Sequence, residues 1–534
     1  MHRHSVAETF DGSCVFVTGF SGFLGKVLVE KLLYSVPGIK KIYCLIRPQK
    51  GQAPVTRLKK ILDSSLFNRI RSRNPDLLTK VYAAAGDMTE KGLGLNQHDH
   101  QEICENVNVV FHCAATVRFD EDLKDAVEMN LLGTARIVAL CHSIRNLRCL
   151  MHASTAYANC TLTTTEEKVY DPPVSPSKLL EALEWMDGDM LKLLTPKLLG
   201  NRPNTYTLTK ALAESFLKED AAQLPAIIVR PSIIGACWRE PLAGWTDNYN
   251  GATGVFVAVA TGALTNMRGS MTARADIVPV DIVSNMCIVA AAHRMQTSYA
   301  EIPVMHCASS DLNPIYWSFI VSFIDRFYVK YPLTSMIRVP AGTFHQSHLM
   351  WWINWKVYHY VPSQIGDWVN GLMGHKQRYM RLCIKVERML EALHYFTSND
   401  WMFQSKALPM LYDQLSHEDQ QTFNFDIRQV NWNSYIFDYF MGTRRYVLKE
   451  ELDTIPQARK NTQTLRYRRF ALQAVLCFIG VRLFGWKART KQQRWTSWLI
   501  SVLAAHWYTN RHSGQPVKMK SLEEYKKSAL EICY

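Results

Sequence analysis

The chain has 534 residues, of which 48% are hydrophobic, and a formal net charge of +14. This length predicts two or three domains, and the composition excludes a disordered or fibrous protein. The 13 cysteines are scattered, without a C-x-x-C pair or a Cys/His cluster at metal-ligand spacing, so neither a disulfide framework nor a metal site is expected. No apolar run opens the chain, and a secretory signal peptide is therefore not predicted.

A strand, a glycine-rich turn and a helix are predicted near the start of the chain. The β-branched run at 15–18 leads into Gly19, Gly22 and Gly25, and a helical pattern follows over 26–33. Such glycines permit a tight turn, close approach of the backbone to a pyrophosphate, and close packing of helix on strand. An ordinary turn is the alternative. The flanking elements favour dinucleotide binding at Thr18, Gly19, Gly22, Phe23, Leu24 and Gly25.

Further apolar runs alternate with helical patterns up to about residue 310. They lie at 41–47, 80–87, 107–115, 148–154 and 226–231. This alternation is typical of an α/β fold, and it predicts a Rossmann-like, doubly wound parallel sheet that is buried on both faces.

The second strand of such a sheet indicates which nucleotide is bound. An acidic residue at its end binds the 2′-hydroxyl of NAD, whereas an arginine accommodates the 2′-phosphate of NADPH. This strand ends at Arg47, with no acidic residue close by in the sequence. We therefore predict NADPH; a solvated strand-end cation is the alternative.

Tyr206 and Lys210 stand four residues apart in a helical stretch, which allows the ammonium group to approach the phenol. A neighbouring cation favours the phenolate and lowers the pKa of a tyrosine. Thr155 follows the fifth strand, at a place where the short-chain dehydrogenase/reductases, which this chain resembles, keep a hydroxyl residue that holds the substrate carbonyl oxygen; Ser154 is the less favoured candidate. We predict Thr155, Tyr206 and Lys210 as the catalytic residues.

With these residues in this order, the chain resembles the short-chain dehydrogenase/reductase superfamily. Asn130-Leu-Leu-Gly-Thr134 and Gly86-Asp87 are similar to motifs of its extended members. The resemblance implies that Tyr206 and Lys210 also touch the cofactor. It adds Asp87, Met88, Ala114, Asn130 and Pro231 to the cofactor site.

The composition of the sequence changes near residue 311, where an aromatic-rich region begins that lacks the alternating pattern of strands and helices. The segment 375–450 has a pattern typical of helices. We predict a reductase domain over 1–330, a mainly helical domain over 331–455, and a basic tail over 456–534.

The tail carries 15 Lys and Arg against 3 acidic residues, which is a net +12 of the total +14. Its apolar stretches at 470–486 and 495–508 are short against the roughly 20 residues of a spanning helix. Basic residues beside apolar segments favour a membrane surface over nucleic acid. A pair of surface helices packed on the body is the alternative, and the number of membrane spans, if any, stays open.

Within the superfamily, the chain resembles the alcohol-forming fatty acyl-CoA reductases. The similarity is carried by the stretches 18–25, 152–160, 166–170, 230–234 and 275–281. A second part of it lies in the aromatic frame formed by Trp401, Phe423-Asn-Phe-Asp426, Asn431-Trp432, Tyr435 and Gly442-Thr-Arg-Arg-Tyr446.

The resemblance implies reduction of a long-chain fatty acyl-CoA to a primary alcohol through a bound aldehyde, for ether lipid or wax synthesis. It also implies a tail bound to membrane lipid, in the peroxisomal membrane or alternatively the endoplasmic reticulum, with the catalytic body facing the cytosol. The oligomeric state stays open.

Several alternatives are weighed against this interpretation. A covalent thioester on Cys160 is a rival mechanism, but no base lies near it in the sequence. A reductase or epimerase for sterols or sugar nucleotides would not need the second domain. A membrane scaffold that only binds a nucleotide would not need the three catalytic residues. The long insertion between Thr155 and Tyr206, with its apolar run at 179–199, is predicted to line an acyl tunnel together with the aromatic domain.

Overall fold

The structure is a computed structural model that describes residues 5–49, 51–484, 490–510 and 517–531. Its centre is a sheet of seven parallel strands in the order β11–β7–β5–β4–β1–β2–β3. The strands are β1 (Cys14–Thr18), β2 (Lys41–Ile46), β3 (Val81–Ala85), β4 (Val107–His112), β5 (Cys149–Ala153), β7 (Ala226–Pro231) and β11 (Val304–Cys307). The Rossmann-like sheet is therefore confirmed. The edge strand β11, which is only four residues long and contains a histidine, was not predicted.

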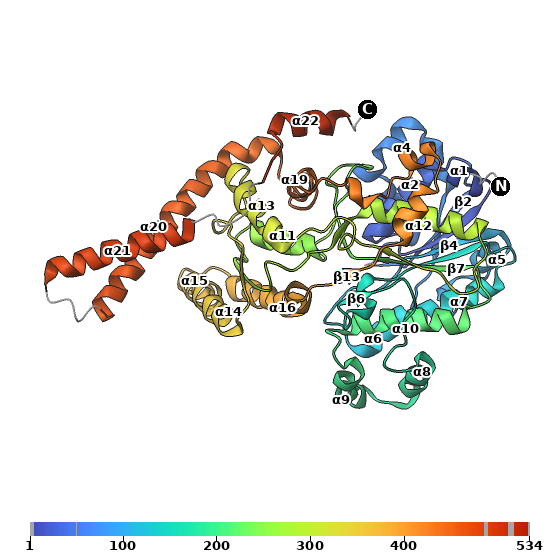
Figure 1. Cartoon of the computed structure of the whole chain (residues 1–534), viewed down its shortest axis with the longest axis horizontal. Coiled ribbons are helices and arrows are strands. Elements are labelled where there is room, and N and C mark those ends of the chain that lie inside the picture. Colours follow the sequence, from blue (N-terminus) through green and yellow to red (C-terminus); the bar gives the residue numbers. More distant parts are fainter. Residues whose placement is uncertain (1–4, 50, 485–489, 511–516, 532–534) are drawn as a thin grey trace.

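Helices cover both faces of the sheet (Figure 1). One face carries α2 (Phe23–Ser35) and α12 (Val280–Gln296), and the other carries α7 (Gly133–Ser143) and α10 (Thr205–Asp220). Side chains alternate along β1 accordingly: Val15 and Val17 join the core beneath α2 and α12, whereas Cys14 and Phe16 join the core beneath α7. Both faces of the strand are therefore apolar, as a parallel sheet requires.

Shorter elements surround this sheet. Before residue 331 they include the helices α1 (Val6–Thr9), α3 (Pro54–Leu62), α4 (Asn68–Arg73), α5 (Gln97–Asn106), α6 (Leu123–Val127), α8 (Pro176–Trp185), α9 (Gly188–Leu199), α11 (Ala252–Ala260) and α13 (Trp317–Lys330), and the strands β6 (Thr164–Thr165), β8 (Ile233–Gly235), β9 (Asn266–Arg268) and β10 (Ile277–Pro279). A π-helical turn, η4 (Glu128–Leu132), precedes α7.

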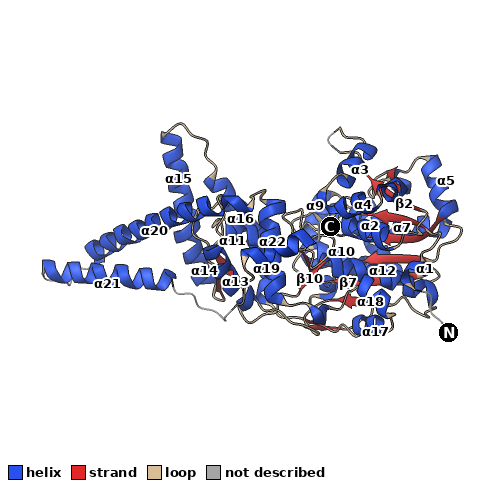
Figure 2. Ribbon diagram, turned by 90° about the horizontal axis from the view of Figure 1, so that it is seen from above, coloured by secondary structure: helices blue, strands red, loops and turns tan. Residues whose placement is uncertain are grey.

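The region after residue 330 is mainly helical (Figure 2). Its elements are β12 (Thr343–His345), α14 (His348–Trp355), η6 (Lys356–Tyr360), α15 (Val361–Leu372), α16 (Tyr379–Ser398), β13 (Met402–Phe403), α17 (Ala407–Asp413), α18 (His417–Thr422) and α19 (Trp432–Gly442). Strand β12 pairs with β9, and β13 pairs with β6. Strands from both sides of the predicted boundary at residue 330 therefore pair with each other.

The tail forms α20 (Ile455–Phe484), α21 (Lys491–Asn510) and α22 (Leu522–Glu531). The predicted apolar stretch 495–508 lies in α21, and 470–486 lies in α20 except for residues 485 and 486, which are outside the described residues. The two helices form a hairpin in which the indole of Trp498 donates to the Ala474 carbonyl over 2.9 Å. Among the described helices, none combines the length and the apolar character that crossing a membrane requires.

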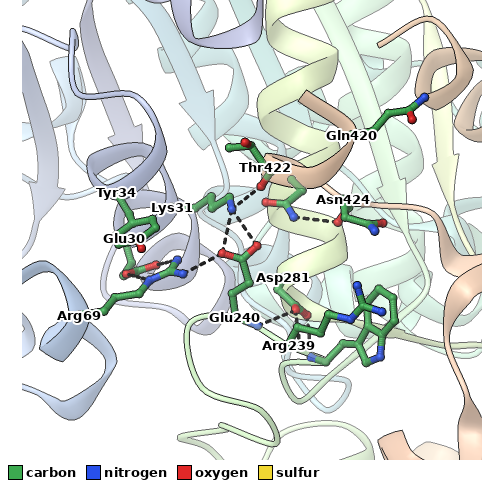
Figure 3. A network of polar contacts seen from close by, with 12 residues as sticks. Glu30, Lys31, Tyr34, Arg69, Arg239, Glu240, Asp281, Gln420, Thr422 and Asn424 are labelled. Atoms are coloured by element: carbon green, nitrogen blue, oxygen red, sulfur yellow. Dashed lines mark hydrogen bonds and ion pairs between the residues drawn. The ribbon is translucent and has the colours of Figure 1, made fainter. Parts of the chain in front are cut away.

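A network of charged side chains joins the helix after the glycine turn to the C-terminal region (Figure 3). Arg69 on α4 contacts both Glu30 on α2 and Glu240, each at 2.7 Å. Lys31 donates to Glu240 over 2.8 Å and to the carbonyl of Thr422 over 2.5 Å. Because Glu30 is fully buried, its charge depends on Arg69 for compensation.

Replacing Arg69 by methionine should lower the free energy of unfolding by about 3–5 kcal/mol, since it leaves the buried Glu30 carboxylate uncompensated. Urea unfolding of the purified chain measures this loss. Arg73→Met is the matched control, because Arg73 is exposed on the same helix and contacts, among the described residues, only Tyr34, over whose ring it lies at 4.9 Å and to whose carbonyl it donates over 3.5 Å, without a buried carboxylate as a partner. Equal stability of the two variants would contradict the assigned role of Arg69.

Candidate active site

The glycine turn between β1 and α2 leaves no room for side chains. Gly19 has φ +75°, and a Cβ atom there would lie 2.7 Å from the Ala114 nitrogen. A Cβ atom on Gly25 would lie 2.3 Å from the Gly19 carbonyl oxygen. Gly22 caps α2 without a side-chain hydrogen bond, so the first N–H groups of that helix can bind a phosphate. The predicted glycines therefore form a tight turn that leaves the first N–H groups of α2 open to a ligand.

Thr18 and Ala114 hold the ends of β1 and β4 beside this turn. The buried Thr18 hydroxyl accepts a hydrogen bond from the Ala114 N–H over 3.2 Å and lies 2.8 Å from Nδ1 of His112. Phe23 and Leu24 are half-buried in the first turn of α2, and the Phe23 ring stacks on Trp245 with 5.5 Å between centroids. These side chains pack around the turn and fix its position between β1 and α2.

Two arginines lie close together, Arg47 just after β2 and Arg57 on α3. Arg47 is half exposed, and its Nη1 is 3.8 Å from the Asp87 carboxylate, which the sheet brings there at the end of β3. The sequence had indicated no acidic residue near Arg47, because Asp87 is adjacent only across the sheet. Arg57 on α3, which was not predicted, donates to the Arg47 carbonyl. Burial lowers the pKa of Arg57, and the charge of Arg47 lowers it further.

Asp87 and Met88 follow β3 in a tight turn. The Asp87 N–H donates to the Leu93 carbonyl over 2.8 Å, and its carboxylate accepts from the N–H and hydroxyl of Thr89. Met88 is buried, and its carbonyl accepts from Arg136 over 2.9 Å. The Asp87 carboxylate thus stays between the ends of β2 and β3, where an adenosine would lie.

Asn130 and Pro231, two further residues predicted for the cofactor site, are both buried. Asn130 lies in η4, and its amide accepts from the Thr116 N–H over 2.9 Å and donates to the Thr209 hydroxyl over 3.0 Å. It therefore connects the loop after β4 to the helix α10. Pro231 is buried at the end of β7, opposite Cys307 of β11.

Tyr206 and Lys210 lie on α10, whose first turn is capped by the side chain of Asn204. Lys210 donates to the Ala153 carbonyl over 2.7 Å, and burial lowers its pKa to about 8. Burial raises the pKa of Tyr206 to about 12, although a hydrogen bond with Thr155 acts in the opposite direction. The expectation that Lys210 lowers the pKa of Tyr206 is thus wrong in this structure, because the ammonium is bound to a backbone carbonyl and burial dominates.

The two hydroxyl residues after β5 have different partners. The Ser154 hydroxyl donates to Glu214, which forms an ion pair with Arg230 at 2.6 Å, and both charged side chains are 1% exposed. Thr155 instead pairs with Tyr206 and accepts from the Tyr157 N–H over 3.2 Å. The structure therefore brings Thr155 to Tyr206, while Ser154 serves the buried ion pair.

Aromatic residues from the C-terminal region close this side of the site. The Tyr206 ring lies 5.8 Å from that of Phe119, which lies 5.2 Å from that of Phe396 on α16. The carbonyl of Cys160 accepts from the Trp401 indole over 2.9 Å and from the Tyr395 hydroxyl over 3.0 Å. Phe119 was not predicted, since a lone phenylalanine in a loop carries no sequence signal for a site 87 positions away.

Comparisons with known proteins agree with this geometry. Two family profiles, both described as Male sterility protein, match residues 17–287 and 358–450. Fatty acyl-CoA reductase 1 from Rattus norvegicus is 42% identical over 92% of this chain and 95% of its own length. The chain belongs to the fatty acyl-CoA reductase family. Fatty acyl-CoA reductase 2 from Bos taurus is 36% identical over the same shares of the two chains.

Solved structures that are similar to this reductase support the fold alone. The reductase domain of a nonribosomal peptide synthetase from Mycobacterium tuberculosis has a TM-score of 0.55 and 19% identity, and it covers 83% of this chain and 95% of its own. The terminal R domain of the myxalamid pathway has a TM-score of 0.53 and 16% identity, with 83% and 93% covered. The match to the family profile and to the named reductases supports a nicotinamide cofactor for this chain.

Cys160 does not have the surroundings of a nucleophile. It is buried, and burial raises the pKa of its thiol to about 11. A catalytic cysteine needs the opposite shift, because the thiolate is the reactive form. The geometry therefore disfavours the rival covalent mechanism in this reductase.

The insertion between Thr155 and Tyr206 forms α8 and α9. Leu179 and Leu191 are buried and anchor these helices against α6 and α10. Trp185 and Leu193 are exposed on the outside. The acyl tunnel that was expected between this insertion and the aromatic domain stays a prediction.

Substituting Gly25 by alanine should abolish nucleotide binding, since the added Cβ atom would collide with the Gly19 carbonyl and open the glycine turn. Fluorescence titration with NADPH measures the binding. Gly188→Ala is the matched control, because a Cβ atom at Gly188 meets no atom within 4 Å. Unchanged affinity of a folded Gly25→Ala variant would refute the location of the phosphate site.

Proposed function

We propose that the chain reduces a long-chain fatty acyl-CoA with NADPH to a primary fatty alcohol, through an aldehyde that stays bound. The observation that carries this proposal is the placement of Thr155, Tyr206 and Lys210 together at the carboxyl end of the sheet, next to the glycine turn. Relatives named fatty acyl-CoA reductase that match almost the whole chain support the substrate class. The alcohol would supply ether lipid or wax synthesis.

The chemistry follows from the charge states of the catalytic residues. At neutral pH the Tyr206 phenol carries its proton and the Lys210 ammonium is charged. Thr155 and Tyr206 would donate to the thioester carbonyl oxygen, on which negative charge develops. One such donor contributes about 10²–10³-fold to the rate. A bound NADPH supplies the hydride.

Protonation of the oxyanion by Tyr206 gives a hemithioacetal. Its collapse breaks the carbon–sulfur bond, expels the thiol of CoA and leaves an aldehyde between the same two donors. A hydride from a second NADPH, which replaces the oxidised cofactor, and a second proton from Tyr206, which solvent has reprotonated in between, would yield the alcohol. Lys210, which is held on the Ala153 carbonyl, would bind the nicotinamide ribose.

Tyr206→Phe should lower kcat about 10²-fold or more while leaving the affinity for NADPH nearly unchanged, because only the donated proton is lost. Oxidation of NADPH in the presence of palmitoyl-CoA, with gas chromatography of the alcohol, measures the effect. Tyr412→Phe serves as a control on a tyrosine away from the site. Wild-type activity in Tyr206→Phe, or no acyl-CoA-dependent oxidation in the unsubstituted chain, would sink the proposal.

The choice of NADPH rests on the two arginines beside the adenosine position. Arg47 and Arg57 adjoin each other, and the acidic Asp87 neutralises only one of two positive charges. A 2′-phosphate would offset the repulsion between them, whereas a 2′-hydroxyl would not.

Removing one of these charges should therefore alter the cofactor preference. We expect Arg57→Ala to raise the KM for NADPH about tenfold or more, as for a lost hydrogen bond to a charged group, with little change for NADH. Steady-state kinetics with both nucleotides test this, and Arg73→Ala controls for loss of a surface charge. An equal effect on both nucleotides would argue for a structural role of Arg57.

We further propose that the tail binds membrane lipid, with the catalytic body in the cytosol. The +12 charge of the last 79 residues and the exposed apolar side chains of α20 and α21 support a lipid surface over nucleic acid. A short apolar segment among many basic residues favours the peroxisomal membrane. Co-localisation of the tagged full chain with peroxisomal and endoplasmic reticulum markers tests this, and an endoplasmic reticulum pattern would overturn the peroxisomal assignment.

A further inference from the structure

The helix α15 has its polar residues turned inward and its apolar residues turned outward. Ser363 and Asp367 are 9% and 7% exposed, and the Asp367 carboxylate accepts from the N–H groups of Arg378, Tyr379 and Met380 at the start of α16. The opposite face carries Val361, Ile365, Trp368, Val369 and Leu372, of which Trp368 is 66% and Leu372 is 70% exposed. This is the reverse of a helix that packs on a core in water.

The apolar face continues onto the preceding helix. Leu349, Met350, Trp352 and Ile353 of α14 and Val357 of η6 are exposed as well. The rings of Trp351 and Trp355 point inward, where they stack at 5.9 Å and are buried, so the helix is firmly attached. We call the exposed side chains of 349–372 the α14–α15 face. A contiguous apolar surface of this kind marks an interaction site.

A row of positive charges flanks this face. Arg378, Arg381, Lys385 and Arg388 are exposed and follow the spacing of one side of α16. The first eight residues of α16, 379–386, contain no acidic residue, and Glu387 is the first acidic residue of the helix. Within the described part of the chain, none of the four forms an ion pair within 4 Å, although the Arg381 charge acts on the Asp367 carboxylate. The charges of Arg378, Lys385 and Arg388 are therefore available to an anionic partner.

We propose that the α14–α15 face lies in the headgroup region of a lipid bilayer that contains anionic lipid, as a contact separate from the tail. A helix with tryptophan and leucine on one side and basic residues beside it is typical of helices that lie in a membrane interface, immersed by about 5–10 Å. A second copy of the chain fits less well, because a twofold contact would bring the basic row of α16 close to its symmetry mate.

The helix α16 joins the α14–α15 face to the residues around Tyr206, and the role inferred for it rests on the proposed function. Its first turn is bound to α15 through Asp367, and its last turn places Phe396 against Phe119 beside Tyr206. With 20 residues, it spans about 30 Å. The helix thus connects the lipid surface to the catalytic residues, so that an acyl chain or a fatty alcohol could pass between site and membrane along it. Figure 2 shows α14, α15 and α16 at the end of the molecule that also carries α20 and α21.

Depth-dependent fluorescence quenching tests the membrane contact without using turnover, so its failure is distinguishable from failure of the proposed function. The full-length chain with Trp368→Cys, labelled with an environment-sensitive fluorophore, is mixed with phosphatidylcholine vesicles that contain phosphatidylserine and brominated acyl chains. Val55→Cys is the matched control, because Val55 is equally exposed, at 67%, on α3 in the other half of the chain. The labelled unsubstituted chain gives the background from native cysteines.

We expect bromine to quench the probe at position 368 and not at position 55. Lys385→Gln should weaken vesicle binding about fivefold, the contribution of one basic residue near an anionic surface. Vesicle binding without quenching at position 368 would mean that the tail alone binds lipid, and it would overturn the proposal. Shielding of the probe from iodide in the absence of vesicles would point to a second copy and would overturn it as well.

Discussion

The ion pair between Arg230 and Glu214 holds the catalytic helix on the sheet. Arg230 projects from β7 and Glu214 from α10, one turn beyond Lys210, and neither has access to solvent. The guanidinium also contacts His306 and the carbonyls of Glu166 and Lys168, which satisfies its remaining donors. Such a buried pair is costly to break from one side. The position of Tyr206 relative to the sheet therefore depends on it.

The same ion pair also determines which of two adjacent hydroxyl groups faces Tyr206. Because Ser154 donates to Glu214, its hydroxyl is committed to the ion pair, and Thr155 is the one that faces Tyr206. The C-terminal region then fixes the same segment from the other side, through the two donors to the Cys160 carbonyl. The segment 154–160 is thus held by the Arg230–Glu214 ion pair on one side and by aromatic residues of the C-terminal region on the other.

The features predictable from the sequence were those set by neighbours along the chain. The turn from Gly19 to Gly25 and the Tyr206-x-x-x-Lys210 pair belong to single elements, so local spacing was sufficient. The proximity of Asp87 to Arg47, the stacking of Phe119 on Tyr206 and the bond from Lys210 to Ala153 join distant segments. The pKa of Tyr206 was mispredicted for the same reason, since burial is a property of the whole fold.

The charged network around Glu240 also joins segments that are far apart in the sequence. Lys31 follows the glycine turn by only a few residues, yet one of its acceptors is the carbonyl of Thr422 near the other end of the chain. Asn285 on α12 likewise donates to the carbonyl of Asn424. The helices that carry the nucleotide site are thus anchored by backbone groups of the C-terminal region.

The pairing of β6 with β13 joins the parts of the chain before and after residue 330. Glu167, just after β6, accepts from the N–H groups of His306 and Ala407, and therefore bridges the sheet and the C-terminal region. A chain cut after residue 330 would take the Ala407 donor from this carboxylate and both donors, Trp401 and Tyr395, from the Cys160 carbonyl. Leaving that buried carbonyl unpaired would cost about 1–3 kcal/mol. The two parts that the family profiles match therefore share a strand pair and hydrogen bonds, and a cut between them would break both.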